Sequence, residues 1–148
     1  MAIKIRSKCA LMAASVALAV FSFGCSMKED MEMATRAAEE FHQSLKAHPD
    51  GKLSVRVAPL FYQSTGRAER EAYFARVRAV LGAPLSWSPV GVHVDNMPAG
   101  RFLSARYQTR FESGVAQESF SWKIEGGQPY LVAYVVSSSL LSPVDSAR

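Results

Sequence analysis

Hydrophobic residues recur at helical spacing in the part of the chain that follows Cys25, and at alternate positions from Leu85 onward. Residues 26–29, Ser-Met-Lys-Glu, have the spacing of a capping box, and more acidic residues follow, so a helix is predicted to begin directly after Cys25. Residues 48–51, His-Pro-Asp-Gly, end it. Its apolar stripe consists of Ala34, Ala37, Ala38, Phe41 and Leu45.

Two further helices are predicted before the strands. Residues 53–61 are interpreted as a short helix, although Leu53, Val55 and Val57 fit a strand equally well and Pro59 limits either element. The next helix is capped by Ser64 or Thr65 and ends at residues 82–84, Gly-Ala-Pro. Its apolar stripe consists of Tyr73, Phe74, Val77, Val80 and Leu81.

The alternating pattern predicts four strands in the second half of the chain. They cover residues 85–94, interrupted by Ser88-Pro89, and residues 102–112, 115–124 and 130–138. Ser113-Gly114 and Gly126-Gly127 are two-residue turn signals that join the last three strands as a meander. Helices followed by strands predict an α+β fold, in which N-terminal helices pack on a curved antiparallel sheet.

With Ser113-Gly114 as the turn, one face of the hairpin is almost wholly apolar, and a slip of one residue would mix the two faces. The predicted pairs on that face are Phe111 with Ala116, Thr109 with Glu118, Tyr107 with Phe120, Ala105 with Trp122, and Leu103 with Ile124. The opposite face holds Arg106, Gln108, Arg110, Ser119, Ser121 and Lys123. In the last strand, one alternating set is Tyr130, Val132, Tyr134 and Val136, and the other is Leu131, Ala133 and Val135. The sequence does not decide which of the two sets faces the core.

Residues 1–24 have the layout of an export signal. Three basic residues, Lys4, Arg6 and Lys8, precede a mainly apolar run over residues 10–23. The run is shorter than the roughly 20 residues that span a bilayer. The predicted organisation is a signal peptide over 1–24, one α+β domain over 25–141 and a flexible tail over 142–148.

The sequence around Cys25 resembles the leader of bacterial lipoproteins, whose cysteine is acylated, with chains such as palmitate, and becomes the mature N-terminus. Ser22 and Phe23 stand where those leaders usually carry a leucine and a small residue. The resemblance implies a lipid-anchored protein of the bacterial envelope. The alternative is cleavage after Ser22-Phe23-Gly24 by an ordinary signal peptidase, which leaves a free thiol on a soluble periplasmic or secreted protein.

Composition narrows the class of protein. The chain has 148 residues, 49% hydrophobic and 20% charged, which suits one globular domain. Its formal charge of +4 falls when the leader is removed, because fourteen basic residues then face thirteen acidic ones. A nearly neutral domain argues against nucleic acid as a partner. Cys9 leaves with the leader, so no disulfide forms within the mature domain.

The order of elements resembles the nuclear-transport-factor-like, or cystatin-like, superfamily of cone-shaped α+β domains. Residues 107–114, 118–122 and 131–137 look like the C-terminal half of small uncharacterised bacterial lipoproteins of that superfamily. The resemblance implies a sheet curled around the long helix with a pocket at the wide end. Relatives include dehydratases, isomerases, binding domains and assembly modules, so the fold selects none of these functions.

Glu118 is the main candidate site residue, because the register places it on the apolar face beside Tyr107, Thr109 and Phe120. A desolvated carboxyl group there has a raised pKa and can serve as acid, base or ligand contact. The structural alternative is a carboxyl group near the sheet end that bonds to Thr109 and reaches water. These four residues form a candidate ligand-binding set, and Glu118 is the candidate catalytic residue.

Other polar residues are interpreted as structural or solvated. His93 and Asp95 share a face near a strand end, and His48 belongs to the helix stop. His42 is expected at the surface, and the alternative is that it lines the pocket mouth beside Phe41. Scattered histidines and unpaired cysteines predict no metal and no cofactor. Trp87 and Trp122 are expected in the core. Solvated charge is expected from Arg106, Arg110 and Lys123 on the outer sheet face, and from the mixed series Arg67, Glu69, Arg70, Glu71, Arg76 and Arg78.

These observations favour a noncatalytic envelope lipoprotein, held at the membrane by its N-terminal lipid. Its domain is expected to bind a small apolar ligand or an envelope protein. The alternative is a small-molecule isomerase or dehydratase with Glu118 as general base and Tyr107 or Tyr134 as hydrogen-bond donor. A homodimer through the sheet is a further expectation.

Overall fold

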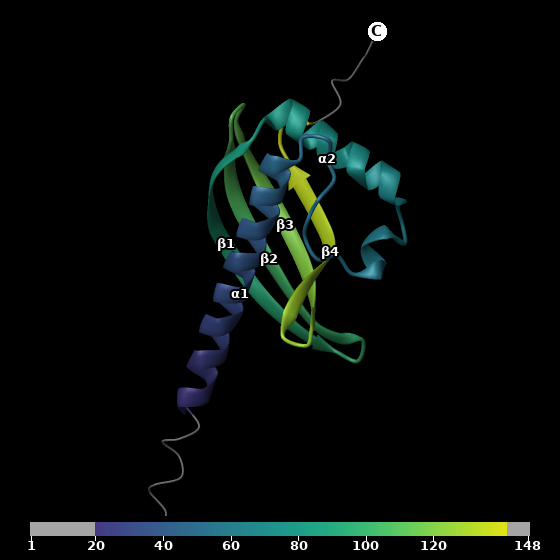
Figure 1. The fold of residues 1–148 in the computed structure, drawn as a ribbon. Coiled ribbons are helices and arrows are strands. Elements are labelled where there is room, and N and C mark those ends of the chain that lie inside the picture. Colours follow the sequence, from purple (N-terminus) through teal and green to yellow (C-terminus); the bar gives the residue numbers. More distant parts are fainter. Residues whose placement is uncertain (1–19, 142–148) are drawn as a thin grey trace, which may run out of the picture.

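The computed structural model describes residues 20–141, with side chains from Ser26 onward. Two α-helices pack against a four-stranded antiparallel meander, which confirms the predicted α+β class (Figure 1). The elements are α1 (Val20–Ala47), the 3₁₀ helix η1 (Pro59–Tyr62), α2 (Arg67–Leu81), β1 (Pro84–Met97), β2 (Gly100–Phe111), β3 (Val115–Glu125) and β4 (Gln128–Ser137). We call the sheet side that packs on α1 the inner face and the opposite side the outer face.

Helix α1 begins at Val20, six residues before the predicted start at Ser26. The predicted capping box therefore lies inside the helix, because the residues before it are helical and supply the carbonyl groups that a cap would replace. No helix within residues 20–141 contains a stretch long and apolar enough to cross a membrane. Most of the predicted leader and the whole predicted tail, residues 142–148, lie outside the described residues.

The segment before η1 is extended, so the helix predicted over residues 53–61 is wrong except at Pro59–Tyr62. Val57 forms a parallel bridge with Leu131 of β4. The Leu131 N–H donates to the Arg56 carbonyl, and the Ala58 N–H donates to the Leu131 carbonyl, both at 2.9 Å. Pairing with a distant strand satisfies these backbone groups and overrides the local helical pattern.

Helix α2 confirms the third predicted helix, and its stop at Gly82 has a φ of 80°. Its N-cap is Gly66, without a side-chain cap, so the capping role assigned to Ser64 or Thr65 is wrong. The arginine series is also less solvated than expected. Arg70 is half-buried, and the side chain of Arg78 is 19% exposed beside Glu112.

The β2–β3 hairpin has the predicted faces but a register shifted by two residues. Tyr107 pairs with Glu118 and Thr109 with Ala116. The turn residues are Glu112 and Ser113 instead of Ser113 and Gly114. Their amides bond to the carbonyls of Ala83 and Leu81, at 3.1 and 2.9 Å, so contact with the end of α2 fixes the turn. A shift of two leaves every side chain on its predicted side.

Strand β4 uses both of its competing side-chain sets. Ser121 pairs with Ala133 and Trp122 pairs with Leu131, so Val132 is an extra residue in a β-bulge. Leu131 points inward before the bulge, and Tyr134 and Val136 point inward after it. The turn at Gly126-Gly127 forms as predicted, with positive φ at both glycines.

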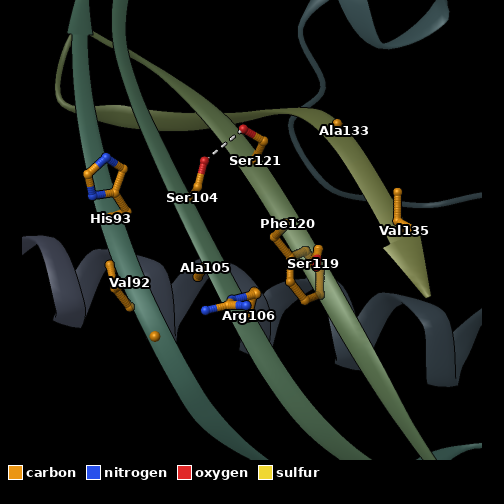
Figure 2. Close-up of a pocket in the computed structure, with 11 residues that line it drawn as sticks. Val92, His93, Ser104, Ala105, Arg106, Ser119, Phe120, Ser121, Ala133 and Val135 are labelled. Atoms are coloured by element: carbon orange, nitrogen blue, oxygen red, sulfur yellow. Dashed lines mark hydrogen bonds between the residues drawn. The ribbon is translucent and has the colours of Figure 1, made fainter. Parts of the chain in front are cut away.

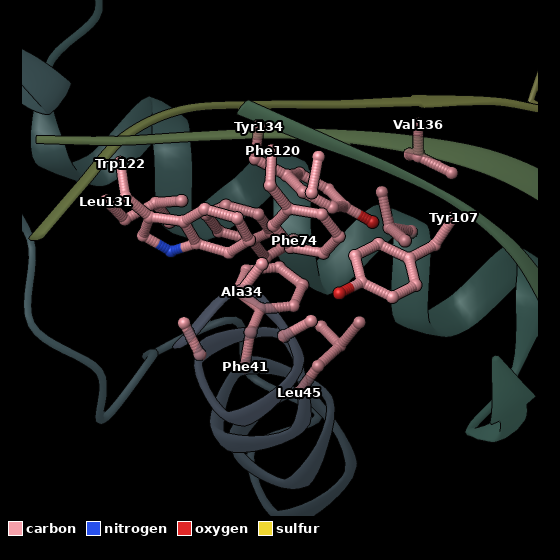
Figure 3. Close-up of a cluster of buried hydrophobic side chains, with 14 of the residues drawn as sticks. Ala34, Phe41, Leu45, Phe74, Tyr107, Phe120, Trp122, Leu131, Tyr134 and Val136 are labelled. Carbon is pink, nitrogen blue, oxygen red and sulfur yellow. The ribbon is translucent and has the colours of Figure 1, made fainter. Parts of the chain in front are cut away.

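The core lies between α1 and the inner face, and it is rich in aromatic side chains (Figure 3). Phe41 of α1 meets Phe120 of β3 and Tyr134 of β4, with ring centroids 5.0 and 4.5 Å apart. Trp122 is buried and stacks on Phe120, as the core prediction requires, whereas Trp87 is only partly buried against the core. This packing places the polar groups described next in a dry environment.

Candidate functional site

A buried polar cluster crosses the core between α1 and the sheet. We define the carboxylate cluster as His42, Thr109, Glu118 and Tyr134. None of these side chains is more than 2% exposed. Glu118 Oε2 lies 2.6 Å from His42 Nε2 and accepts a hydrogen bond from Thr109 Oγ1. Glu118 Oε1 accepts a hydrogen bond from the Tyr134 hydroxyl at 2.6 Å.

Four elements bring the cluster together. His42 comes from the C-terminal part of α1, Thr109 from β2, Glu118 from β3 and Tyr134 from β4 beyond its bulge. The prediction placed Thr109 directly opposite Glu118. In the structure Tyr107 takes that position, and Thr109 is the diagonal neighbour of Glu118. Diagonal neighbours in a sheet remain within reach of long side chains.

The placement of His42 contradicts its predicted surface position. Its side chain is 0% exposed, and its ring lies 4.3 Å from the Trp87 ring, centroid to centroid. The signal was present in the sequence, since His42 follows Ala38 by four residues and precedes Leu45 by three. Those spacings put it on the buried stripe of the helix.

Burial and charge set the electrostatics of the cluster. Loss of water around the phenol, followed by the charge of Glu118, raises the pKa of Tyr134 well above its ordinary value of 10. Burial also raises the pKa of Tyr107 and of Tyr73. The Tyr134 hydroxyl therefore keeps its proton above pH 10, where an exposed tyrosine loses it, and donates it to Glu118 Oε1.

The four residues proposed from sequence as a ligand-binding set do lie together. Tyr107, Thr109, Glu118 and Phe120 are all buried on the inner face. Glu118 is 0% exposed, so the expectation that its carboxyl group reaches water is wrong, although its bond to Thr109 is present. With both oxygens engaged by side chains, Glu118 reaches no solvent in this arrangement.

A second candidate site is a hollow in the outer face, with a volume of about 400 Å³ (Figure 2). We call it the outer hollow. The hollow exists because small residues line it, among them Gly91 on β1 and Ala133 on β4. The Ser104 and Ser121 hydroxyl oxygens lie 3.2 Å apart across β2 and β3. Val135, 60% exposed, gives an apolar wall, and the exposed Arg106 places a cation at the rim.

The remaining polar candidates lie at the surface, and His93 among them also lines the outer hollow. His93 Nε2 lies 3.0 Å from Asp95 Oδ1, and both side chains are exposed on the same face, as predicted. Lys123 lies 2.8 Å from Glu125. Within residues 20–141, no group of three His, Cys, Asp or Glu side chains is arranged to hold a metal ion.

Comparison of the chain with protein-family models, curated proteins and solved structures found no match.

Proposed function

We propose that the chain is a noncatalytic cell-envelope lipoprotein, acylated at Cys25, whose α+β domain binds a small apolar ligand in the outer hollow. The leader pattern supports export and anchoring. Several acyl chains on one cysteine hold a protein at a membrane far more firmly than the single chain that gives marginal binding. The resemblance to lipoproteins of the nuclear-transport-factor-like superfamily supports the same assignment.

The observation that carries the binding role is the contrast between the two faces of the sheet. The inner face is filled by packed aromatic side chains. The outer face is hollowed where Gly91 and Ala133 carry little or no side chain. A concave, mainly apolar site with a few polar groups is the usual form of a small-molecule site. Ser104, Ser121 and Arg106 supply those polar groups here.

Mass spectrometry of the protein purified from membranes of its host tests both parts of the proposal. The denatured mass is expected to begin at Cys25 and to include acyl chains, and Cys25→Ser is expected to lose them. An unmodified Cys25 would overturn the anchor. Under native conditions, additional mass that is released by denaturation is expected from the ligand.

Two matched variants of β4 locate the ligand. Ala133→Leu fills the outer hollow, whereas Ser137→Leu adds the same side chain at an exposed position farther along β4. The released mass is expected to disappear in Ala133→Leu and to remain in Ser137→Leu. Retention in both variants would exclude the outer hollow as the site. Sedimentation of the native protein then shows whether a second copy, docked sheet to sheet, occupies this face instead.

A second candidate function, an isomerase or dehydratase, is favoured by one observation. Glu118, the proposed general base, lies within hydrogen-bond distance of the His42 imidazole and accepts a hydrogen bond from the Tyr134 phenol, the proposed hydrogen-bond donor. A turnover screen with small enolisable ketones and hydroxy compounds tests it. Turnover that is lost in Glu118→Gln, with the fold intact, would replace the noncatalytic proposal with this one.

A further inference from the structure

A separate hollow lies where the loop after α1 meets η1 and the first turn of α2. We call it the basic hollow. It has a volume of about 200 Å³, and three cationic side chains line it, Lys52, Arg67 and Arg70, together with one acid, Glu71. Lys52 pairs with Asp50 at 3.5 Å. The two guanidinium groups therefore carry the positive charge that remains.

Both guanidinium groups are held by aromatic rings. The Arg67 guanidinium lies 4.5 Å from the centroid of Tyr62, and that of Arg70 lies 4.8 Å from the centroid of Phe61. A cation held over a ring has lost part of its rotamer freedom before any ligand arrives. Among residues 26–141, neither arginine forms an ion pair. The Nε of Arg70 is buried and has no acceptor within the same residues.

The positive charges of Arg67 and Arg70 lower the stability of α2 when no ligand is bound. Arg67 and Arg70 stand at the start of the helix, where the dipole disfavours cations and Glu69 is the acid of the first turn. A bound anion would relieve this repulsion. Charges that oppose the local stability of a helix, and that are also restrained and unpaired, are typical of a site organised for a ligand.

Close packing of the loop shapes one wall. Gly51 has a φ of 81° and its backbone lies against the backbone of Glu71, so a Cβ there would overlap the Glu71 carbonyl oxygen. Gly51 also donates its N–H to the His48 carbonyl at 3.0 Å. This contact holds Lys52 near the start of α2.

We propose that the basic hollow binds a small oxyanion, the phosphate or carboxylate group of a water-soluble ligand. Guanidinium forks match the paired oxygens of both groups, and the volume suits a small molecule. Figure 1 places η1 and the start of α2 far from the Val20 end of α1. A domain anchored through Cys25 therefore holds this hollow away from the bilayer, which favours a dissolved ligand over a lipid headgroup.

Titration of the full domain with inorganic phosphate and with succinate, followed by amide chemical shifts, tests the proposal. Saturable shifts are expected at Gly51 and Lys52. Arg67→Gln and Arg70→Gln are each expected to weaken binding about tenfold, the loss of one charge-assisted contact. Arg76→Gln, the same charge change at an exposed position of α2, is the matched control and is expected to bind as the parent does.

Further measurements separate binding from folding and from general charge effects. Arg67→Lys keeps the charge but loses the fork, so its affinity is expected between those of the parent and Arg67→Gln. Phosphate is expected to raise the Tm of the parent more than chloride at equal ionic strength. Equal weakening in all three glutamine variants, or shifts that chloride reproduces, would overturn the proposal. Binding to phosphatidylglycerol vesicles without any response to phosphate would overturn the assignment to a dissolved ligand.

Discussion

Glu118 lies 2.6 Å from His42, a residue 76 positions earlier in the chain, and both side chains have no solvent exposure. The contact joins the C-terminal part of α1 to the third strand of the sheet. A buried charged group costs stability unless partners satisfy it, and Thr109 and Tyr134 complete that set here. The carboxylate cluster thus specifies how α1 docks on the sheet, since a small slide of the helix would separate His42 from Glu118.

Removal of the shared acceptor is expected to be strongly destabilising. Glu118→Ala leaves His42, Thr109 and Tyr134 without their partner, so the free energy of unfolding is expected to fall by about 3–5 kcal/mol. Urea denaturation at pH 7 measures it. Glu125→Ala removes a surface ion pair with Lys123 and is expected to cost less than about 1 kcal/mol. Similar losses in the two variants would contradict the role of the cluster.

The raised pKa of Tyr134 predicts how stability depends on alkaline pH. The folded state holds the phenol proton more tightly than the unfolded chain, whose tyrosines titrate near pH 10. This contribution is complete below pH 10 and is lost as the pH rises from 10 toward the folded pKa. For each proton that the folded state binds in excess, the free energy of unfolding falls by about 1.4 kcal/mol per pH unit.

Urea titrations between pH 8 and 11 check this prediction. Tyr134→Phe is expected to decline less steeply above pH 10 than the parent, with a residual slope from Tyr73 and Tyr107, whose pKa values burial also raises. Thr109→Val removes another hydrogen bond to Glu118 but no titrating group, so it is expected to lower stability at every pH and keep the slope. If the free energy of unfolding of Tyr134→Phe falls with pH as steeply as that of the parent above pH 10, the prediction is wrong.

The β2–β3 hairpin shows which level of structure the sequence determines. Alternation assigned Tyr107, Thr109 and Glu118 to the buried face, and that assignment survives a register error of two residues because side chains alternate with period two. The turn itself could not be predicted locally. Backbone bonds to Ala83 and Leu81, together with the 2.7 Å bond from the Ala83 amide to the Glu112 side chain, fix it from outside the hairpin.

The other errors also arise from distant contacts. The bulge at Val132 lets Leu131 and Tyr134 both point inward, and Leu131 also pairs with the segment before η1. A local pattern cannot show either effect. His42 is a different case, because its helical spacing was visible but a lone imidazole is usually exposed. Its partner, Glu118, explains the exception.

Two glycines with positive φ are expected to respond differently to alanine. Gly126 has a φ of 56° and open space where a Cβ would lie, so Gly126→Ala is expected to cost about 1–2 kcal/mol, the strain of the left-handed backbone alone. Gly51→Ala adds a clash with the backbone of Glu71 to the same strain. Thermal unfolding is therefore expected to show a clearly larger loss of Tm for Gly51→Ala. A smaller loss there would mean that the loop moves away from α2 easily.

The ion pair between Asp30 and Arg101 is expected to fix the N-terminal part of α1 on the sheet. Asp30 is 7% exposed and lies five residues after Cys25, so this contact sets how the domain sits relative to the proposed anchor. Arg101→Gln leaves the buried Asp30 carboxylate without its cation, and is expected to lower the free energy of unfolding by about 1–3 kcal/mol. Amide exchange over residues 26–33 is expected to accelerate.

Lys28→Gln, which removes an exposed pair with Glu32 on the same helix, is expected to change neither measurement appreciably. If exchange accelerates equally in both variants, general charge on α1, and not the bond to Arg101, holds this part of the helix.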